Sequence, residues 1–358
     1  MPIETIEDLR EHLALAVEVE MSTVPLYLFG LYSIVDQDSE CAKLIRSVVT
    51  EEMLHVVLVS NLLLAVGSEP RFDLPAILPE YPAPLKHHRP PLTLDLAPVS
   101  VEVIRDTYMT IERPEDHGAH PEADEYSTLG QFYHAIELAF HKLSASDPIF
   151  ERPQLNRQMA EPAFYAPVEY DADDSGGLIG IDDLDSACGA IETMIHQGEG
   201  VSLDRWADES HQELTHFHKY KLLVEGAIPL GAVHPCLVNP KRDSLPEQLH
   251  DTVDLFNASY RHLLLTMDEL FSGTADQPAL VGVLYHVMVR LLRPLGRFLA
   301  EHSIGDGVTA GPTFELYEFK AAERVQELVD LASRCAATFP QLAEVAHDVA
   351  SLPRSVIA

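Results

Sequence analysis

The chain has 358 residues, with 57 acidic and 24 basic side chains, a formal net charge of −33 at pH 7 and an apolar fraction of 46%. Its length and apolar content allow one large domain or two smaller ones, each with a sizeable core. Its acidity argues against partners that bind through phosphate groups, such as nucleic acids, and against anionic membrane surfaces.

Cysteine spacing and apolar runs predict where the protein works. Cys41, Cys188, Cys236 and Cys335 are far apart and form no CxxC motif, which predicts free thiols in a reducing compartment. The N-terminal residues contain no apolar core of the signal-peptide type. The longest apolar runs are interrupted by polar residues such as His55, so we expect no membrane-spanning helix and a cytoplasmic location.

Helical periodicity dominates the chain from its start. It predicts two long helices over 5–33 and 41–66, joined by the short polar turn "VDQDSE" as an antiparallel hairpin. Residues 68–98 contain eight prolines and predict a long ordered crossover without helix. An irregular insert is predicted over 147–185. Further helices are predicted over 100–112, 127–145, 183–199, 202–226, 245–272, 277–302 and 319–349.

Two helices carry the pattern E-x-x-H on their apolar faces. Glu52 stands at the centre of the apolar stripe of the second long helix, and His55 lies at its edge one turn on. Glu213 and His216 repeat the pattern in a later helix. Residues at i and i+3 share a helix face, and an unpaired charge on a buried face costs several kcal/mol. Each pair is therefore either a self-satisfied acid–imidazole pair or part of a metal site.

Single carboxylates occupy the apolar faces of two more helices. Glu20 lies on that face of the first helix, and Glu137 on that of the helix predicted over 127–145. In a helical hairpin, residues equally far from the turn face each other. The midpoint between Glu20 and Glu52 falls inside the turn, which predicts that both lie at the same height. Glu18 and His218 each lie on the side of their helix opposite to the predicted ligands, so both are expected to face solvent.

The four helices together offer a recognisable set of ligands. One Glu from each of two helices, plus E-x-x-H from each of two others, is the set used by ferritin-like dimetal carboxylate bundles. Iron is favoured, manganese fits the same carboxylate and imidazole donors, and the set does not require haem. Coincidentally buried acid–imidazole pairs remain the alternative. The predicted metal ligands are Glu20, Glu52, His55, Glu137, Glu213 and His216.

Several other residues lie close to these predicted ligands. Tyr27 and Tyr133 share faces with them and are either hydrogen-bond donors or radical relays at the site, or ordinary core residues. His134 and His141 flank the third-helix carboxylate and could replace or supplement it. Glu209 lies one turn before the second E-x-x-H and either orients a ligand or faces solvent.

Eight stretches distributed along the chain form a pattern that is more specific than the ligands alone. They are "LALAVEVEMSTVPLYLFGLYSI", "VVTEEMLHVVLVSNLLLAVG", "LPEYPAPL", "MTIERPE", "LGQFYHAIE", "IHQGEG", "ELTHFHKYKLL" and "TAGPTFE". In these stretches the chain resembles the ferritin-like family named after the iminophenyl-pyruvate dimer synthase of violacein biosynthesis. This resemblance implies an all-α, ferritin-like four-helix bundle, oxidative coupling of amino-acid-derived imines, and the same six metal positions. The violacein enzyme is much longer, so the ferritin-like part stands almost alone here.

These observations lead to one expected function and three alternatives. We expect residues 1–228 to form a dimetal bundle with its crossover and insert, and residues 229–358 a helical extension packed on it. The expected activity is that of a non-haem dimetal enzyme, with iron favoured over manganese, that acts as an O2-dependent oxidase or oxygenase on a small, amino-acid-derived molecule in biosynthesis. Such an enzyme would need O2, a small-molecule substrate and an electron donor. The sequence does not decide whether the protein forms a homo-oligomer. The alternatives are a ferroxidase or iron-storage protein, a manganese catalase-like protein, and a haem-associated imine-coupling synthase.

Overall fold

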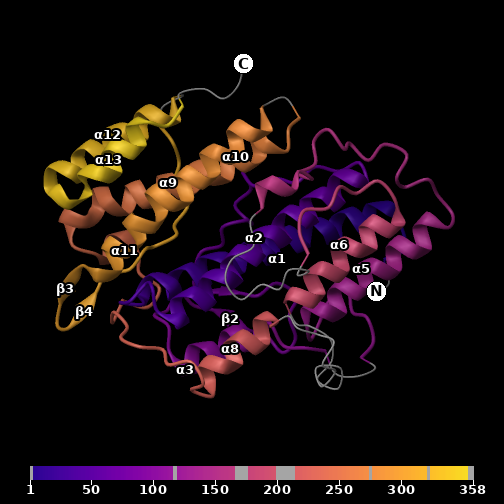
Figure 1. The fold of residues 1–358 in the computed structure, drawn as a ribbon, viewed down its shortest axis with the longest axis horizontal. Coiled ribbons are helices and arrows are strands. Elements are labelled where there is room, and N and C mark those ends of the chain that lie inside the picture. The colour runs from indigo at the N-terminus through magenta and orange to yellow at the C-terminus, as the bar shows by residue number, and fades with distance from the viewer. Residues whose placement is uncertain are drawn as a thin grey trace.

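The computed structural model describes residues 3–115, 119–165, 176–198, 214–273, 276–320 and 323–353. Helices dominate these residues, which confirms the predicted all-α class (Figure 1). The α-helices are α1 (Ile6–Ser33), α2 (Glu40–Ala65), α3 (Val101–Val103), α4 (Met109–Ile111), α5 (Leu129–Ser144), α6 (Leu184–Gln197), α8 (His216–Val224), α9 (His250–Leu270), α10 (Gln277–His286), α11 (Arg293–Glu301), α12 (Arg324–Thr338) and α13 (Ala343–Ala350).

Short elements connect or interrupt these helices. The π-helical segments are η1 (Ile104–Tyr108) and η5 (Val287–Leu292). The 3-10 turns are η2 (Pro162–Phe164), η3 (Arg242–Ser244), η4 (Glu247–Leu249) and η6 (Pro340–Leu342). The strands form two antiparallel pairs, β1 (Ala83–Pro84) with β2 (Thr93–Leu94) and β3 (Ser303–Gly305) with β4 (Val308–Thr309).

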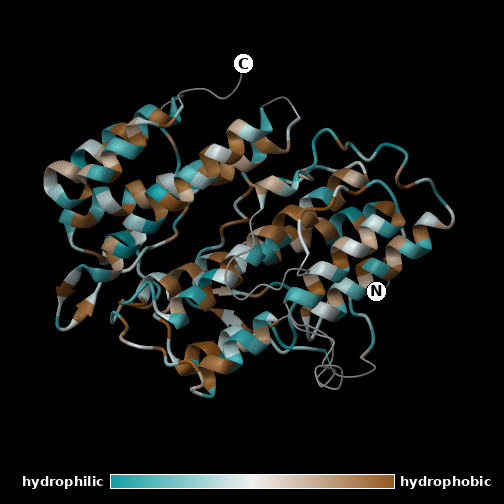
Figure 2. Cartoon of the chain, in the orientation of Figure 1, coloured by the Kyte–Doolittle hydropathy of each residue, from teal (hydrophilic) through white to brown (hydrophobic). Residues whose placement is uncertain are grey.

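The α1–α2 hairpin forms the centre of the molecule, as the sequence predicts (Figure 1). Thr5 caps α1 by accepting a hydrogen bond from the Asp8 backbone N–H, and the Asp8 carboxylate accepts one from the Thr5 backbone N–H, which completes a capping box. The Ser39 hydroxyl caps α2 by accepting a hydrogen bond from the Ala42 backbone N–H. Apolar residues line both helices (Figure 2), and most of their side chains are buried.

The other helices pack around this hairpin. α5 packs on α1, and α6 packs on α2 and on α5. α8 contacts α2 and the segment α3–η1–α4, so this segment and α8 lie together on one side of the hairpin (Figure 1). α11 contacts α1, and α9 to α13 occupy the opposite side (Figure 1). The predicted C-terminal helices are therefore present, and the domain division after residue 228 stays a prediction.

The proline-rich crossover is ordered without helix, as predicted. It buries apolar side chains such as Phe72 and Leu94, and pairs β1 with β2. The Tyr81 hydroxyl donates a hydrogen bond of 2.8 Å to the Ser22 carbonyl, which fixes the crossover to α1. The segment therefore delivers the chain to α3 along a defined path.

Some predicted helices differ in detail from the observed ones. The helix expected over 319–349 is split into α12 and α13, because Pro340 removes a backbone donor and starts a 3-10 turn. The helix expected over 277–302 contains the π-helical segment η5. The helix expected over 202–226 is described only from residue 214 onward, and α8 begins at His216.

Within the described part of the chain, three helical stretches are long and apolar enough to cross a membrane by length and composition. These are Ile6–Ser33, Glu40–Ala65 and Gln277–Glu301. The sequence analysis expected the polar residues in these runs to leave no stretch long and apolar enough to span a membrane. That expectation is wrong, because single residues such as His55 lower the mean hydropathy of a long window only slightly. In the first two stretches, 78% and 83% of the apolar window is buried inside the protein.

Candidate metal centre

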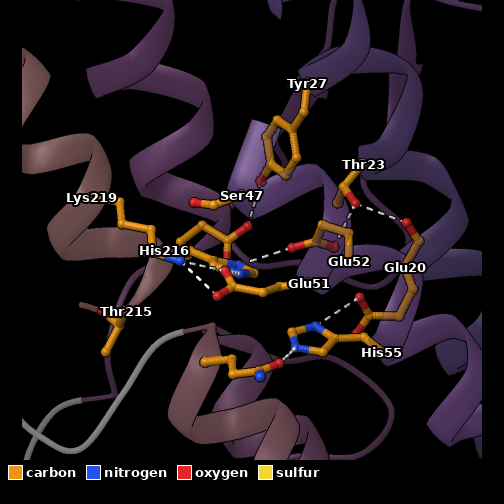
Figure 3. Close-up of polar contacts among 12 residues, drawn as sticks. Glu20, Thr23, Tyr27, Ser47, Glu51, Glu52, His55, Thr215, His216 and Lys219 are labelled. Atoms are coloured by element: carbon orange, nitrogen blue, oxygen red, sulfur yellow. Dashed lines mark hydrogen bonds and ion pairs between the residues drawn. The ribbon is translucent and has the colours of Figure 1, made fainter. Parts of the chain in front are cut away.

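Five buried side chains form two ligand groups that share one carboxylate. Glu20, Glu52 and His55 make the first group, and Glu52, Glu112 and His216 make the second. Within each group, one ligand atom from each residue lies within 4.8 Å of the others. Figure 3 shows Glu52 between the two imidazoles, with Glu20 on the His55 side. A carboxylate shared in this way would be a ligand of both ions if each group held one.

Each carboxylate of the cluster accepts a hydrogen bond from a hydroxyl at one oxygen and has the other oxygen near an imidazole. Tyr133 donates to Glu20 Oε1, and Tyr27 donates to Glu112 Oε1. Thr23 Oγ1 donates to Glu52 Oε2 at 2.9 Å (Figure 3). These uncharged donors orient the carboxylates without neutralising their negative charge.

The oxygens that remain face the two imidazoles. Glu20 Oε2 lies 3.6 Å from His55 Nδ1. Glu52 Oε1 and Glu112 Oε2 lie 3.0 and 3.4 Å from His216 Nδ1. Both histidines therefore turn Nδ1 toward the carboxylates.

The outer nitrogens of the two imidazoles are held by hydrogen bonds. His55 Nε2 donates to Gln197 Oε1 at 3.0 Å, and His216 Nε2 donates to Glu51 Oε2 at 2.8 Å. An Nε2–H donor leaves Nδ1 with its lone pair, so this tautomer suits metal binding through Nδ1. The rings are stacked with centroids 5.5 Å apart.

A buried ion pair lies behind His216. Lys219 Nζ contacts both Glu51 oxygens, at 2.7 and 2.6 Å, and neither side chain is exposed to solvent. Glu51 therefore accepts from His216 on one side and from Lys219 on the other (Figure 3). The sequence analysis did not predict this series of contacts. Its only visible signals were Glu51, next to Glu52 in "TEEMLH", and Lys219 in "THFHKY".

Burial and mutual repulsion shift the pKa values of the cluster. Burial and the charge of Glu112 raise the pKa of Glu52 to about 7. Burial alone would raise the pKa of Glu20, but the hydrogen bond and charge of His55 outweigh it and lower that pKa. Burial opposes protonation of His216, yet the charge and hydrogen bonds of Glu112, Glu51 and Glu52 raise its pKa well above the usual value.

The charge balance of the cluster fits metal binding. The described residues around it bury four glutamates, Glu20, Glu51, Glu52 and Glu112, and one lysine, Lys219. In the metal-free protein the raised pKa values of Glu52 and His216 let protons compensate part of this negative charge. With both imidazoles neutral, as metal binding through Nδ1 requires, these five charged side chains carry a net charge of −3. Buried charge of this size is costly unless it is paired or coordinates a metal. Divalent ions between the carboxylates and Nδ1 atoms would remove that cost.

Glu112 is the site residue that sequence reasoning missed. It follows α4, at the end of the helix predicted over 100–112 and within the stretch "MTIERPE". It is 2% exposed, and its backbone N–H donates to the Tyr108 carbonyl. The π-helical segment η1 precedes it, a feature that is frequent at functional sites. The segment is too short to show a long apolar stripe, so its carboxylate did not stand out.

Glu137 is not part of this cluster. It is half-buried on α5 and lies with His141 and Cys188 instead. Tyr133, one turn earlier on α5, is the residue that faces Glu20. α5 therefore contributes a hydroxyl donor to the cluster rather than a carboxylate, because its next turn packs toward α6. His134 is paired with Glu115 at 3.1 Å, so neither flanking histidine replaces a ligand in the cluster.

The sequence analysis also named Glu209 and Glu213 near the site and expected His218 and Glu18 to face solvent. Glu209 and Glu213 lie outside the described residues. The expectation that His218 faces solvent is wrong, since it is 6% exposed and contacts Thr215 Oγ1 at 3.0 Å. Burial and nearby Lys221 lower the pKa of His218 to about 4. Glu18 is partly covered and paired with Lys86.

An apolar cavity of about 410 Å³ lies elsewhere, between the hairpin and the C-terminal helices. Its lining includes Met21 of α1, Met53 of α2 and Met267 of α9. None of the five cluster residues lines it. On α2 the lining residues Met53 and Val57 follow a different helix face from His55. The cavity is therefore distinct from the candidate metal centre.

Removing the hydroxyl donors should weaken metal binding without disturbing the packing. Tyr133→Phe and Tyr27→Phe each keep the ring but release one carboxylate from its donor. Outer-shell changes of this kind cost roughly 10–100-fold in metal affinity, and we expect that loss in a Mn²⁺ titration by calorimetry. Tyr220→Phe is the matched control, because its buried hydroxyl has no hydrogen-bond partner among the described residues. Equal affinity in all three variants would contradict the assigned role.

Metal binding should depend on pH around neutrality. The pKa of Glu52 is about 7 and that of His216 is raised well above its usual value, so protons compete with a metal ion for both side chains. The apparent Mn²⁺ affinity is therefore expected to fall as the pH is lowered from about 8 to about 6. Calorimetry in two buffers of different ionisation enthalpy should show proton release on binding. A pH-independent affinity without proton release would contradict this.

Comparisons with known proteins identify the family and the fold of the chain. A family model described as ferritin-like matches residues 13–225. The chain is 26% identical over 425 aligned residues to dichlorochromopyrrolate synthase of Lentzea aerocolonigenes, covering 99% of this chain and 40% of that protein. It is 24% identical over 358 residues to 2-imino-3-(indol-3-yl)propanoate dimerase of Chromobacterium violaceum, covering 87% of this chain and 34% of that protein. The chain therefore spans about two fifths or less of the length of these relatives.

A solved structure shares the fold. The crystal structure of a ferritin-like protein from Caulobacter vibrioides superposes with a TM-score of 0.63 at 22% identity, covering 89% of this chain and all of that chain. This likeness supports the fold, and the match of the family model to more than half of the chain supports the family. The resemblance predicted from the sequence is thereby confirmed. The chain belongs to the ferritin-like family.

Proposed function

We propose that this protein is a dimetal oxidase or oxygenase that uses O2 to oxidise a small, amino-acid-derived molecule. The observation that carries the proposal is the sharing of Glu52 by two buried carboxylate–imidazole groups. Carboxylate oxygens and imidazole nitrogens suit iron and manganese. Iron is the preferred ion, since a pair of iron ions supplies electrons for a reaction with O2 when bound.

The names of the relatives suggest the class of substrate. One relative is named a dimerase of 2-imino-3-(indol-3-yl)propanoate and the other a synthase of dichlorochromopyrrolate. Both names describe biosynthetic enzymes. Because this chain spans only part of their length, we propose the same broad class, a small amino-acid-derived molecule, rather than the same product.

The side chains around the cluster would hold the ligands and control protons. Glu20, Glu52 and His55 would hold one ion, and Glu52, Glu112 and His216 the other. Tyr27 keeps its proton, because burial and the charge of Glu112 raise its pKa well above the usual value. Its hydroxyl, hydrogen-bonded to Glu112, is placed to keep that carboxylate oriented as the charge of the site changes.

Anaerobic reconstitution with Fe²⁺ tests the proposal. The expected result is two iron ions per chain, followed by O2 uptake that changes when an imine of tryptophan is supplied. The imine can be generated by an added amino-acid oxidase, whose own O2 uptake is subtracted, and its consumption followed by mass spectrometry. Glu52→Gln is the matched variant and should show neither iron binding nor added O2 uptake.

Other outcomes would favour the competing functions. Accumulation of many irons per chain as a mineral would favour storage. Rapid disproportionation of hydrogen peroxide by the manganese form would favour a catalase-like role. No O2 uptake by the iron-loaded protein, with or without the imine, would overturn the proposed oxidase.

A further inference from the structure

A second group of metal-binding side chains lies where α5 packs against α6. Glu137 and His141 stand one turn apart on α5, and Cys188 lies on α6. One ligand atom from each lies within 4.8 Å of the other two. His141 Nε2 is 3.5 Å from Cys188 Sγ. Bonds to a zinc ion are about 2.0–2.3 Å long, so small side-chain rotations bring all three atoms around one ion.

The surroundings of this group favour entry of a cation. His141 is exposed and Glu137 and Cys188 are half-buried, so an ion reaches the group without unfolding. All four cysteines are free, as the sequence predicts, and Cys188 is the one that is not buried. Asp185 and Glu192, one turn before and after Cys188 on α6, add negative charge near the thiol.

We propose that Glu137, His141 and Cys188 bind a divalent ion of the Zn²⁺ class, separate from the ions of the buried cluster. Thiolate, imidazole and carboxylate are all zinc ligands, and three protein ligands leave a fourth position for water. The thiol gives its proton to solvent when the ion binds, because the thiolate is the ligand. The five side chains of the buried cluster offer only oxygen and nitrogen, so sulfur distinguishes the two sites.

Such an ion would connect two helices that are distant in sequence. His141 and Cys188 are 47 residues apart, and the described part of the chain between α5 and α6 contains one short 3-10 turn, η2. A bond across this span closes a long loop, and cross-links that close long loops restrict the unfolded chain most. Binding of the ion should therefore raise the midpoint of thermal unfolding.

Titration of the full chain with Co²⁺ alone tests this site. Co²⁺ replaces Zn²⁺ and shows a thiolate-to-metal charge-transfer band in the near ultraviolet only when sulfur is a ligand. In Glu52→Gln, whose buried cluster should bind no ion, we expect the band to saturate at one equivalent, and the same equivalent of Zn²⁺ to raise the unfolding midpoint. Cys188→Ser and His141→Ala, each combined with Glu52→Gln, should lose the band and the rise in midpoint.

Two variants serve as controls. His134→Ala removes a partly buried histidine of the same helix that is paired with Glu115, and it should keep the band. Glu52→Gln, which removes the shared carboxylate of the buried cluster, should also keep it. The absence of a band in the unmodified protein, a band that persists in Cys188→Ser, or its loss in Glu52→Gln would overturn this proposal. A failure of the proposed oxidase would leave the band unchanged, so the two proposals fail separately.

Discussion

Glu52→Gln should abolish binding of both metal ions at the buried cluster, whereas Glu20→Gln or Glu112→Gln should weaken mainly one. Glu52 belongs to both ligand groups, and each of the other two carboxylates belongs to one. Loss of an outer-shell group already costs roughly 10–100-fold in affinity, so loss of the shared ligand should cost more than about 100-fold. Elemental analysis after equilibrium dialysis with Fe²⁺ or Mn²⁺ measures the remaining ions per chain.

The fold should survive this substitution, which keeps the result interpretable. In the metal-free protein the pKa of Glu52 is raised from 4.5 to about 7, so its charge destabilises the folded state increasingly as the pH rises through that window. Gln carries no charge, and the metal-free variant should be at least as stable as the parent above neutral pH. Glu18→Gln, on the same hairpin and paired with Lys86, is the control that should retain both ions. Full metal occupancy in Glu52→Gln would refute the bridging role.

Lys219→Met should destabilise the metal-free protein by about 3–5 kcal/mol, the usual cost of breaking a buried ion pair from one side. Lys219 and Glu51 are both fully buried, and the substitution removes the ammonium group that contacts both Glu51 oxygens. Glu51 also accepts from His216, so the same change should disturb the orientation of that imidazole. Urea unfolding of the metal-free variant measures the loss of stability.

A double-mutant cycle separates the ion pair from simple packing. Glu51→Gln with Lys219→Met removes both charges and keeps an amide that can accept from His216, so the double variant should regain much of the lost stability. Lys43→Met, which breaks an exposed pair with Glu40 one turn away, should change stability by less than about 1 kcal/mol. A double variant no more stable than Lys219→Met alone would show that the charge is not the cause.

Local sequence patterns are enough to predict the first two helices and how they pair. The periodicity of the first 66 residues predicts α1, α2 and their hairpin, because each helix shows one long apolar face and a short polar turn joins them. Hairpin symmetry then predicts that Glu20 and Glu52 lie at the same height. The structure places their carboxylate oxygens, with a nitrogen of His55, within 4.8 Å of one another. Local pattern is sufficient here because a short turn fixes which residues face each other.

Contacts between distant parts of the chain select the other side chains that join this hairpin. Glu112 belongs to the cluster and Glu137 does not, because the path of the crossover brings the short segment α3–η1–α4 beside α8, while α5 turns its Glu137 toward α6. The burial of His218 and the pairing of Glu51 with Lys219 arise in the same way, since α8 is covered on more than one face. Helical periodicity reports the face that a helix buries, but the choice of neighbouring helix depends on contacts between residues far apart in the chain, which no local pattern records.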